Sequence, residues 1–218
     1  MRLLLAILTM GVLMGLAPIP VFAGVLVFDD FNDGDAAGWE EFDGTFSVVD
    51  GVYRVGASGG CNDARAVIGD PAWSDYIIET DFNFTEGSDH AAILFRVQEI
   101  ASGCDAGKYY QFHIFQNEVG ICRMNYSGGA CSVLRSASTS VSANQWHHLV
   151  LIVNGPNLTA FIDGVEVLAF DGLTHYPTGR VGVKNINNGA NLYDNFEVYT
   201  GLVSDLPSAW GAVKVMYR

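Results

Sequence analysis

Short runs in which apolar and polar residues alternate recur along the chain between residues 25 and 199. Alternation with a period of two places successive side chains on opposite faces of a strand. Gly, Asn, Asp and Ser separate these runs, and no long run shows the period of a helix. Many short strands divided by turn residues predict an all-β fold, an antiparallel β-sandwich or jelly roll of two sheets.

One of the turns carries a specific signal. Asp50 and Gly51 lie between the alternating runs TFSVV and VYRVGA. An Asp-Gly pair in this position is typical of a two-residue hairpin, because both residues tolerate the positive φ that the turn requires. We therefore expect the two runs to pair as neighbouring strands.

The central runs have one apolar face and one mixed face. In KYYQFHIF, residues 108–115, alternation places Tyr110, Phe112 and Ile114 on the apolar face. The opposite face carries polar and aromatic side chains, which are Tyr109, Gln111, His113 and Phe115. Such a face is either the solvated side of an antiparallel sheet or a surface that binds a ligand, and the pattern leaves both open.

The N-terminal end differs from the alternating part. Residues 1–23 combine a positive start, a long apolar run and an ending in Val21-Phe22-Ala23 that fits a signal-peptide cleavage site. A retained membrane anchor is the alternative, and no other run approaches the roughly 18 apolar residues that span a bilayer. We expect removal of residues 1–23, a jelly-roll domain over residues 24–200, and a secreted or cell-surface location in a bacterium.

Residues 201–218 are expected to form a separate C-terminal tail. Trp210, Val213 and Tyr217 recur at helical spacing after Ser208, a candidate N-cap, so a short helix is predicted. The tail is similar to the Trp-Gly-x-x-Lys-x-x-Tyr-Arg endings of many exported bacterial proteins. That resemblance implies a sorting or surface-attachment segment.

The net charge excludes one class of binding partner, and the cysteines indicate disulfide bonds. The formal net charge of −13 repels phosphate backbones and argues against nucleic acid. Four cysteines in an exported chain favour two disulfides, for which three pairings exist. Cys122 and Cys131 flank a hairpin tip, and Cys61 and Cys104 lie in two Gly-rich loops, which favours the pairs Cys61–Cys104 and Cys122–Cys131. The CxxC spacing of a zinc site is absent.

The ordered set of motifs resembles the concanavalin A-like lectin/glucanase superfamily in its laminin G-like branch. The stretch VFDDFNDGDAAGWEEFDGTFSVVDGVYRVG is similar to the opening of these domains. The stretch from QWHHLVLIVNG to ANLYDNFEVY is similar to their closing pattern, which ends in a strand with Asp-Asn. The resemblance covers nearly all of residues 25–200. It implies a two-sheet jelly roll that often binds glycans and sometimes cleaves them.

Retaining glycosidases of that superfamily carry two glutamates on one strand face in an E-x-D-x-E motif. The nearest match here runs from Glu79 through Asp81 to Asn83, and Asn83 cannot serve as a general acid. The motif is therefore broken, and laminarinase-type catalysis is not expected. Glu79 and Asp81 then form a polar strand face, which we expect to pair with Arg96 on the following strand.

A second resemblance is to the 3-keto-disaccharide hydrolase family, which has the same fold. Its pattern of E-x-x-F, then G-x-x-F-R, then a tyrosine and a glutamate is matched loosely by Glu79, Arg96 and Tyr110. Gln111 or His113 stands where the glutamate is expected. The resemblance implies a glycoside-cleaving enzyme in which Glu79 and His113 are the candidate catalytic residues, with His113 as base.

Oxygen-rich residues near both ends of the domain indicate a cation site. The run DDFNDG includes Asp30, and the first and last strands of this superfamily pair, which places Asp194 beside Asp29 or Asp30. Calcium prefers about six to eight oxygen ligands, so a structural calcium ion at Asp30 and Asp194 is one expectation. The alternative is a network in which these carboxylates accept backbone amides and Asn195 occupies a bulge.

Sugars bind through aromatic rings and through hydrogen bonds from Asn, Asp, Gln and Arg. The expected ligand-binding residues are Arg96, Tyr109, Gln111, His113 and Arg123, and further candidates are Trp73, Tyr126 and Arg135. By the family pattern, Trp39 and Trp146 are instead core anchors.

The sequence favours a secreted, non-catalytic carbohydrate-binding or adhesive module whose partner is a glycan or polysaccharide. The alternatives are a glycoside-cleaving enzyme of the 3-keto-disaccharide hydrolase type and a structural surface domain without a small ligand. The enzyme requires Glu79, Arg96 and His113 to converge in one cleft, whereas the other two classes do not.

Overall fold

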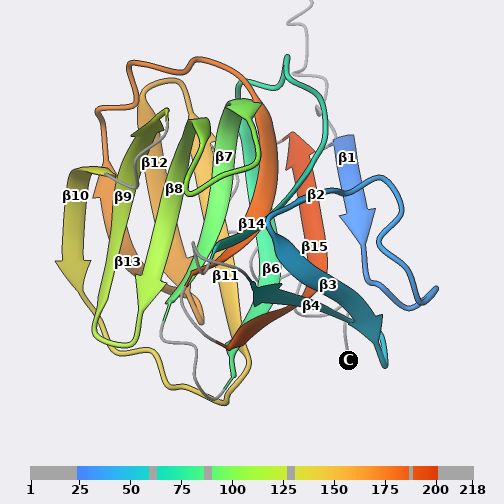
Figure 1. The fold of residues 1–218 in the computed structure, drawn as a ribbon. Coiled ribbons are helices and arrows are strands. Elements are labelled where there is room, and N and C mark those ends of the chain that lie inside the picture. The colour runs from blue at the N-terminus through green and yellow to red at the C-terminus, as the bar shows by residue number, and fades with distance from the viewer. Residues whose placement is uncertain (1–23, 59–62, 86–89, 127–130, 187–188, 201–218) are drawn as a thin grey trace, which may run out of the picture.

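The computed structural model describes residues 24–58, 63–85, 90–126, 131–186 and 189–200. The predicted signal peptide and the predicted tail lie outside these residues. The described part of the chain forms two antiparallel sheets (Figure 1). It contains no helix that is long and apolar enough to cross a membrane. The predicted all-β, two-sheet sandwich is confirmed.

Fifteen strands are described, and they divide between an eight-stranded and a seven-stranded sheet. The eight-stranded sheet has the spatial order β13 (Val165–Phe170), β12 (Asn157–Ile162), β11 (His147–Asn154), β6 (Tyr76–Phe84), β15 (Ala190–Thr200), β4 (Val52–Ala57) and β3 (Gly44–Val49), and β1 (Gly24–Asp29) also pairs with β15. The seven-stranded sheet has the order β10 (Ser132–Ser138), β9 (Glu118–Asn125), β8 (Gly107–Phe115), β7 (His90–Ile100), β14 (Arg180–Ile186), β5 (Asp63–Ile68) and β2 (Glu40–Phe42).

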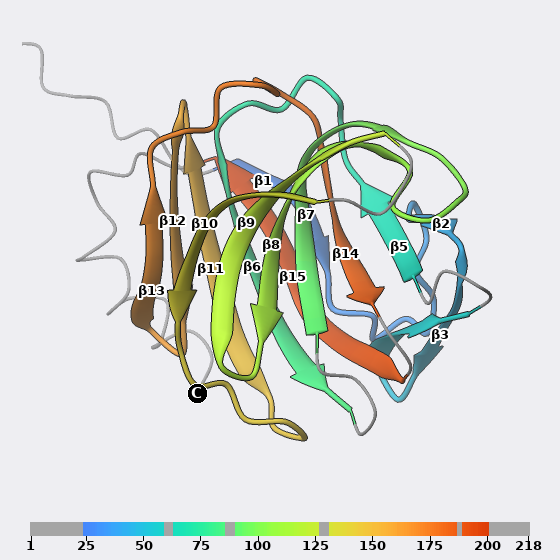
Figure 2. The same cartoon turned by 60° about the vertical axis from the view of Figure 1, so that its left-hand side comes forward.

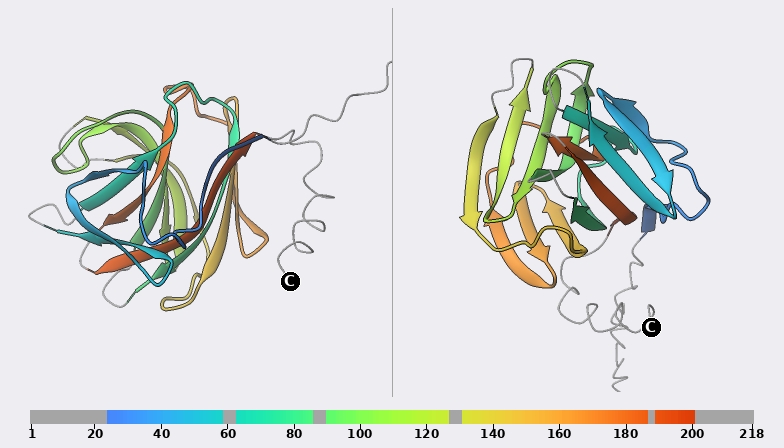
Figure 3. Two further views of the ribbon diagram at one scale, coloured as in Figure 1. Left: turned by 90° about the vertical axis from the view of Figure 1, so that its right-hand side faces the viewer. Right: turned by 60° about the horizontal axis from the view of Figure 1, so that its bottom comes forward.

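The two sheets lie face to face, as the side view shows (Figure 3). Their inner faces enclose one main apolar core. Tyr110, Phe112 and Ile114 of β8 are buried in this core, as the alternation predicts. A smaller cluster, which includes Tyr109 and Met124, lies on the other face of the seven-stranded sheet. Each sheet therefore has an inner face toward the core and an outer face.

The predicted hairpin at Asp50-Gly51 is confirmed, because β3 and β4 pair around it and its two residues have φ values of 53° and 75°. Asp163-Gly164 joins β12 and β13 with the same signs of φ. Strand β2 was not predicted, because three residues are too few to show alternation.

Strands β6 and β7 follow one another in the chain but belong to different sheets. The partners of β6 are β11 and β15. The predicted pair of Glu79 and Asp81 with Arg96 of β7 is therefore wrong, because it assumed that consecutive strands are neighbours in one sheet.

The first and last strands pair as predicted, with Asp29 opposite Phe196. Trp39 donates a hydrogen bond from its Nε1 to the Asp29 carboxylate at 2.8 Å. Its ring meets the Phe196 ring edge-on at 4.9 Å between centroids, so Trp39 is a core anchor as expected. Trp146 is 46% exposed, and the prediction that it anchors the core is wrong.

The disulfide between Cys122 and Cys131 is confirmed, with a Cα–Cα distance of 5.5 Å. The predicted Cys61–Cys104 pair includes Cys61, which lies outside the described residues, so this pairing stays a prediction. Every cysteine among the described residues is disulfide-bonded.

Candidate functional site

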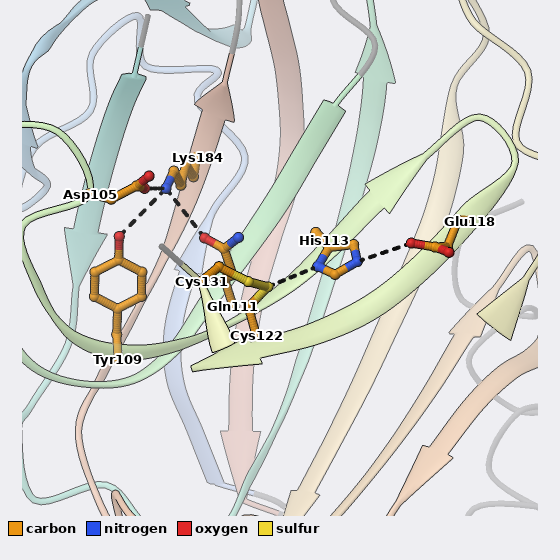
Figure 4. Close-up of a disulfide and its surroundings, with 8 residues drawn as sticks. All are labelled: Asp105, Tyr109, Gln111, His113, Glu118, Cys122, Cys131 and Lys184. Carbon is orange, nitrogen blue, oxygen red and sulfur yellow. Dashed lines mark hydrogen bonds and ion pairs between the residues drawn. A yellow bond between two sulfur atoms is a disulfide. The ribbon is translucent and has the colours of Figure 1, made fainter. Parts of the chain in front are cut away.

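A row of polar side chains crosses the outer face of the seven-stranded sheet (Figure 4). We call this set the polar row, and its members are Asp105, Lys184, Tyr109, Gln111, His113 and Glu118. Strands β8 and β14 carry its central members, because every second residue of a strand points to the same face. The row has two ends that differ in charge and in exposure.

The ionic end is built around Lys184, whose side chain is fully buried. Its Nζ forms an ion pair with Asp105 and lies 3.6 Å from Asp63 Oδ1. It also lies 3.3 Å from Gln111 Oε1 and 3.5 Å from Tyr109 Oη. Burial alone lowers the pKa of Lys184, but these oxygen-bearing neighbours raise it above its ordinary value. Lys184 is therefore a buried cation.

Arg65 of β5 extends the ionic end and holds the loop that follows β7. Its fully buried guanidinium pairs with Asp43 and donates to the carbonyl oxygens of Ala101, Gly103 and Ala106 at 3.2, 2.7 and 2.9 Å. These bonds fix residues 101–106 against the sheet. The cations of the ionic end are thus inaccessible to solvent, and the main role of this end is structural, because it holds residues 101–106 against the sheet.

The imidazole end is built around His113. Its Nδ1 lies 3.5 Å from Cys122 Sγ, and its Nε2 lies 3.8 Å from a carboxylate oxygen of Glu118. Gly120 lies opposite His113 in the register, and a Cβ there would come within 2.4 Å of Nε2. The absence of a side chain at Gly120 therefore leaves room for the His113 ring. Burial lowers the pKa of His113 despite the nearby Glu118, so the ring is neutral at pH 7.

His90 of β7 completes the imidazole end. Its ring centroid lies 5.9 Å from that of His113 and 4.1 Å from that of Phe115. Burial lowers its pKa to about 3, so this ring is also neutral. Its Nε2 is buried and has no hydrogen-bond partner among the described residues. Buried polar atoms are nearly always paired, so an ordered water or a bound group is the natural partner for this one.

Exposure separates the two ends. His90 and His113 are 7% and 4% exposed, and the Glu118 side chain is 49% exposed. Lys184 and Arg65 have no exposed surface. The Glu118 carboxylate is therefore the exposed group of the imidazole end, and the rings of His90 and His113 lie beneath the surface beside it.

The predicted ligand-binding residues divide into three places. Tyr109, Gln111 and His113 lie together in the polar row. Arg123 lies opposite Tyr110 in the register and so belongs to the other face of the sheet. Arg96 has a φ of 49° and its buried guanidinium faces loop carbonyls, away from the row.

Arg96 binds three segments at one end of the sandwich. It donates hydrogen bonds to the carbonyl oxygens of Ser74, Gly155 and Tyr176 at 3.1, 2.6 and 3.3 Å. A Cβ on Gly179 would lie 2.3 Å from the Arg96 backbone, so the chain passes closely here. These contacts give Arg96 a structural role.

Glu79 lies on the outer face of the other sheet, where β6 pairs with β11 and β15. It accepts a hydrogen bond from Tyr199 and lies 3.7 Å from His148 Nε2. His148 Nδ1 lies 2.8 Å from Asp81 Oδ1. Glu79 and His113 therefore occupy opposite outer faces of the sandwich. The convergence of Glu79, Arg96 and His113 in one cleft does not occur.

His148 is expected to make stability depend on pH. Its hydrogen bond with Asp81, together with the nearby carboxylates of Glu79 and Asp163, raises its pKa above the ordinary 6.5. A raised folded-state pKa contributes stability that is complete below the unfolded pKa and disappears as pH rises through the folded pKa. Replacing His148 with Asn should therefore destabilise the protein more at about pH 6 than at about pH 9.

Urea unfolding of the wild type and of His148→Asn at both pH values measures this difference. All other titrating groups are common to the two proteins, including Tyr199, which donates to Glu79, and the uncharged Asn195 donates to Asp81 in both. An equal destabilisation at both pH values would contradict the prediction.

Asp30 and Asp194 both accept backbone amides. Asp30 Oδ1 accepts from Asn32 N at 3.2 Å, and Asp194 Oδ1 accepts from Asn195 N at 2.7 Å. Asn195 has a φ of 50° at a bulge where the register with β6 shifts. Among the described residues no group of three or more acidic, histidine or cysteine side chains is placed to hold a metal ion. The predicted calcium ion therefore stays a prediction.

Several members of the site were not predicted from the sequence. They are Asp63, Arg65, His90, Asp105, Glu118 and Lys184. Alternation could have found Arg65, which stands between the core residues Ala64 and Ala66. It could also have found Lys184, which follows the core residues Val181 and Val183 at odd spacing. No sequence signal brings the loop residue Asp105 to Lys184.

The family of 3-keto-alpha-glucoside-1,2-lyase-like domains matches residues 28–199. No curated protein matches the sequence. Among solved structures, the carbohydrate-binding module CBM66 from Bacillus subtilis is similar, with 18% identity, a TM-score of 0.62, and coverage of 75% of this chain and 96% of that chain. SCLam, a non-specific endo-beta-1,3(4)-glucanase from family GH16, has 13% identity, a TM-score of 0.61, and coverage of 84% and 93%. The potassium-bound Emp46p carbohydrate recognition domain has 11% identity, a TM-score of 0.59, and coverage of 82% and 95%.

At these identities the solved structures show a shared fold. The concanavalin A-like jelly roll is therefore confirmed, and the assignment to the laminin G-like branch stays a prediction.

Proposed function

This chain belongs to the family of 3-keto-alpha-glucoside-1,2-lyase-like domains, and we propose that it binds a carbohydrate at the imidazole end of the polar row. The observation that carries the proposal is the buried, unpaired Nε2 of His90 beside the neutral ring of His113. A neutral imidazole nitrogen accepts a hydrogen bond from a sugar hydroxyl, and the Glu118 carboxylate offers a second acceptor. The ring of Phe115 supplies apolar surface next to them.

The expected result is that replacing His90 with Phe weakens carbohydrate binding about tenfold, which corresponds to one lost hydrogen bond. Phe keeps the ring that packs on Phe115 and removes the nitrogen atoms, so the fold should be unchanged or more stable. Isothermal titration with a sugar identified on a glycan array measures the affinity, and a melting curve measures stability.

The matched control is His175→Phe, because His175 is an exposed histidine on the loop before β14. It should leave affinity unchanged. The proposal is wrong if no sugar of the array binds the wild type, or if His90→Phe and His175→Phe bind equally well.

Cleavage of a 3-keto-α-glucoside is the second candidate function, and the neutral state of His113 favours it. A keto group at C3 makes the proton on C2 acidic. In the tautomer whose Nδ1–H points at Cys122 Sγ, Nε2 has a free lone pair that can take this proton. The released electron pair forms the C1–C2 double bond, the C1–O bond breaks, and the imidazolium returns the proton to the leaving oxygen.

The test uses p-nitrophenyl 3-keto-α-glucoside, from which this elimination releases p-nitrophenol. Replacing His113 with Phe should lower the rate about 10²–10⁴-fold, as expected for the loss of a general base. Because the pKa of His113 is lowered from 6.5, the fall in rate at acid pH should be centred below pH 6.5. A wild type that releases no p-nitrophenol rejects catalysis and leaves the binding proposal standing.

Export, surface attachment and calcium binding complete the proposal. The signal-peptide pattern of residues 1–23 supports export, and a secreted product that still carries these residues would contradict it.

The similarity of the last residues to bacterial sorting endings supports attachment to the cell surface, and unchanged localisation after deletion of residues 205–218 would contradict it. The proximity of Asp30 to Asp194 supports calcium at the strand seam, and equal melting temperatures with calcium and with EDTA would contradict it.

A further inference from the structure

We propose that a groove at one edge of the sandwich, separate from the polar row, binds a neutral oligosaccharide. We call it the edge groove. It has a volume of about 680 Å³ and is lined by Leu134, Arg135, Asn157, Thr159, Phe170 and Asp171, among others. Pockets of about 300–1,000 Å³ are typical of small-molecule sites. The ligand class rests on the proposed function, whereas the position of the groove does not.

The groove lies where the last strands of the two sheets meet. Strand β10 has only β9 as a partner, and β13 has only β12, within the described residues. Both views of the ribbon place β10 beside β12 and β13 (Figures 1 and 2). A strand at the edge of a sheet presents unpaired backbone N–H and C=O groups. Backbone donors and acceptors therefore flank the groove.

The apolar surface of the groove is held in place by packing. Leu134 and Phe170 are partly buried and pack against the main core, and Leu158 beneath them is fully part of it. A Cβ on Gly172 would lie 2.3 Å from the Phe170 ring, so the ring fits closely over this glycine. A fixed aromatic ring offers a surface for the apolar C–H face of a pyranose.

The polar groups of the groove are balanced in charge. Arg135 and Asp171 are both exposed, and each is without an ion pair among the described residues. Asn157 and Thr159 add neutral hydrogen-bonding groups. One cation and one anion favour a ligand without net charge, because a charged ligand would meet repulsion from one of them. Fixed apolar surface, balanced charge and many donors and acceptors together fit a neutral oligosaccharide.

The experiment is titration of ¹⁵N-labelled protein with maltotriose, cellotriose and laminaritriose, followed by NMR. At least one sugar should shift the amide signals of β10, β12 and β13. Arg135→Ala should weaken this binding at least tenfold, because it removes the charged donor from an exposed site where folding does not depend on it. Gly172→Ala should also weaken it at least tenfold, because it displaces the Phe170 ring while leaving every lining side chain present.

His90→Phe separates the two proposals. It should weaken binding at the imidazole end about tenfold and leave the affinity of the edge groove unchanged, and Arg135→Ala should do the reverse. The edge groove proposal is overturned if none of the three sugars shifts the amide signals of β10, β12 and β13. An extended valine-rich peptide that shifts these signals when no sugar does would show that the groove binds an added strand instead. The proposal is also overturned if Gly172→Ala and Arg135→Ala bind as well as the wild type while keeping its melting temperature.

Discussion

Replacing Lys184 with Met is expected to lower the free energy of unfolding by about 3–5 kcal/mol. Lys184 Nζ is enclosed by Asp105, Asp63, Tyr109 and Gln111, and the side chain has no exposed surface. Removal of the cation leaves buried negative charge and unpaired oxygens, and that unpaired charge is the main source of the loss. Urea unfolding of both proteins measures the difference.

A matched control is Lys108→Met on the same sheet. Lys108 is paired with Glu99 at 3.2 Å, but both side chains are substantially exposed, so its loss should change stability far less. The double variant Lys184→Met with Asp105→Asn should recover part of the stability, because it removes one of the unpaired charges. Equal effects of Lys184→Met and Lys108→Met would show that the ionic end contributes no more than a surface pair.

Replacing Arg96 with Met is expected to lower the free energy of unfolding by about 3 kcal/mol or more while leaving carbohydrate affinity unchanged. The guanidinium bonds Ser74, Gly155 and Tyr176 through their carbonyl oxygens, and each buried acceptor left unpaired destabilises the fold by about 1–3 kcal/mol. Unfolding and titration on the same preparation test both halves of the prediction.

Two further variants test whether the effect of Arg96→Met comes from the guanidinium group and from its burial. Arg96→Lys keeps the charge but loses the planar fork that reaches several carbonyls at once, so an intermediate loss is expected. Arg180→Met removes an arginine whose partner Glu40 is exposed, and it should destabilise much less. A large fall in carbohydrate affinity for a folded Arg96→Met protein would restore the sequence prediction that Arg96 is a ligand-binding residue.

Alternation predicted the strands well because it reports directly on which side chains face the core. It placed Tyr109, Gln111 and His113 on one face, and the structure places all three in the polar row. The same alternation holds along β11, where His147 contacts the inner Phe82 and His148 contacts Asp81 on the outer face. These predictions succeed because the face on which a side chain lies depends only on its position within its own strand.

Contacts between strands could not be predicted in the same way. Alternation does not state which sheet a strand joins, so Glu79 and Arg96 were assigned to neighbouring strands that the fold separates. The role of Arg96 depends on a positive φ and on three distant loops, none of which leaves a local pattern. Gly120 shows the same limit, because only the register reveals that its missing side chain makes room for His113.

The bulge in the last strand has a consequence for how the domain can change in length. Asp194 to Glu197 on β15 oppose only Asp81 to Glu79 on β6, so the chain carries one extra residue at Asn195. Loss of that residue would restore regular alternation, in which Phe196 and Val198 still face the core and Glu197 still opposes Glu79. The inner face of β15 can therefore tolerate the loss of Asn195, whereas insertion of one residue after Phe196 would turn the later side chains to the opposite face.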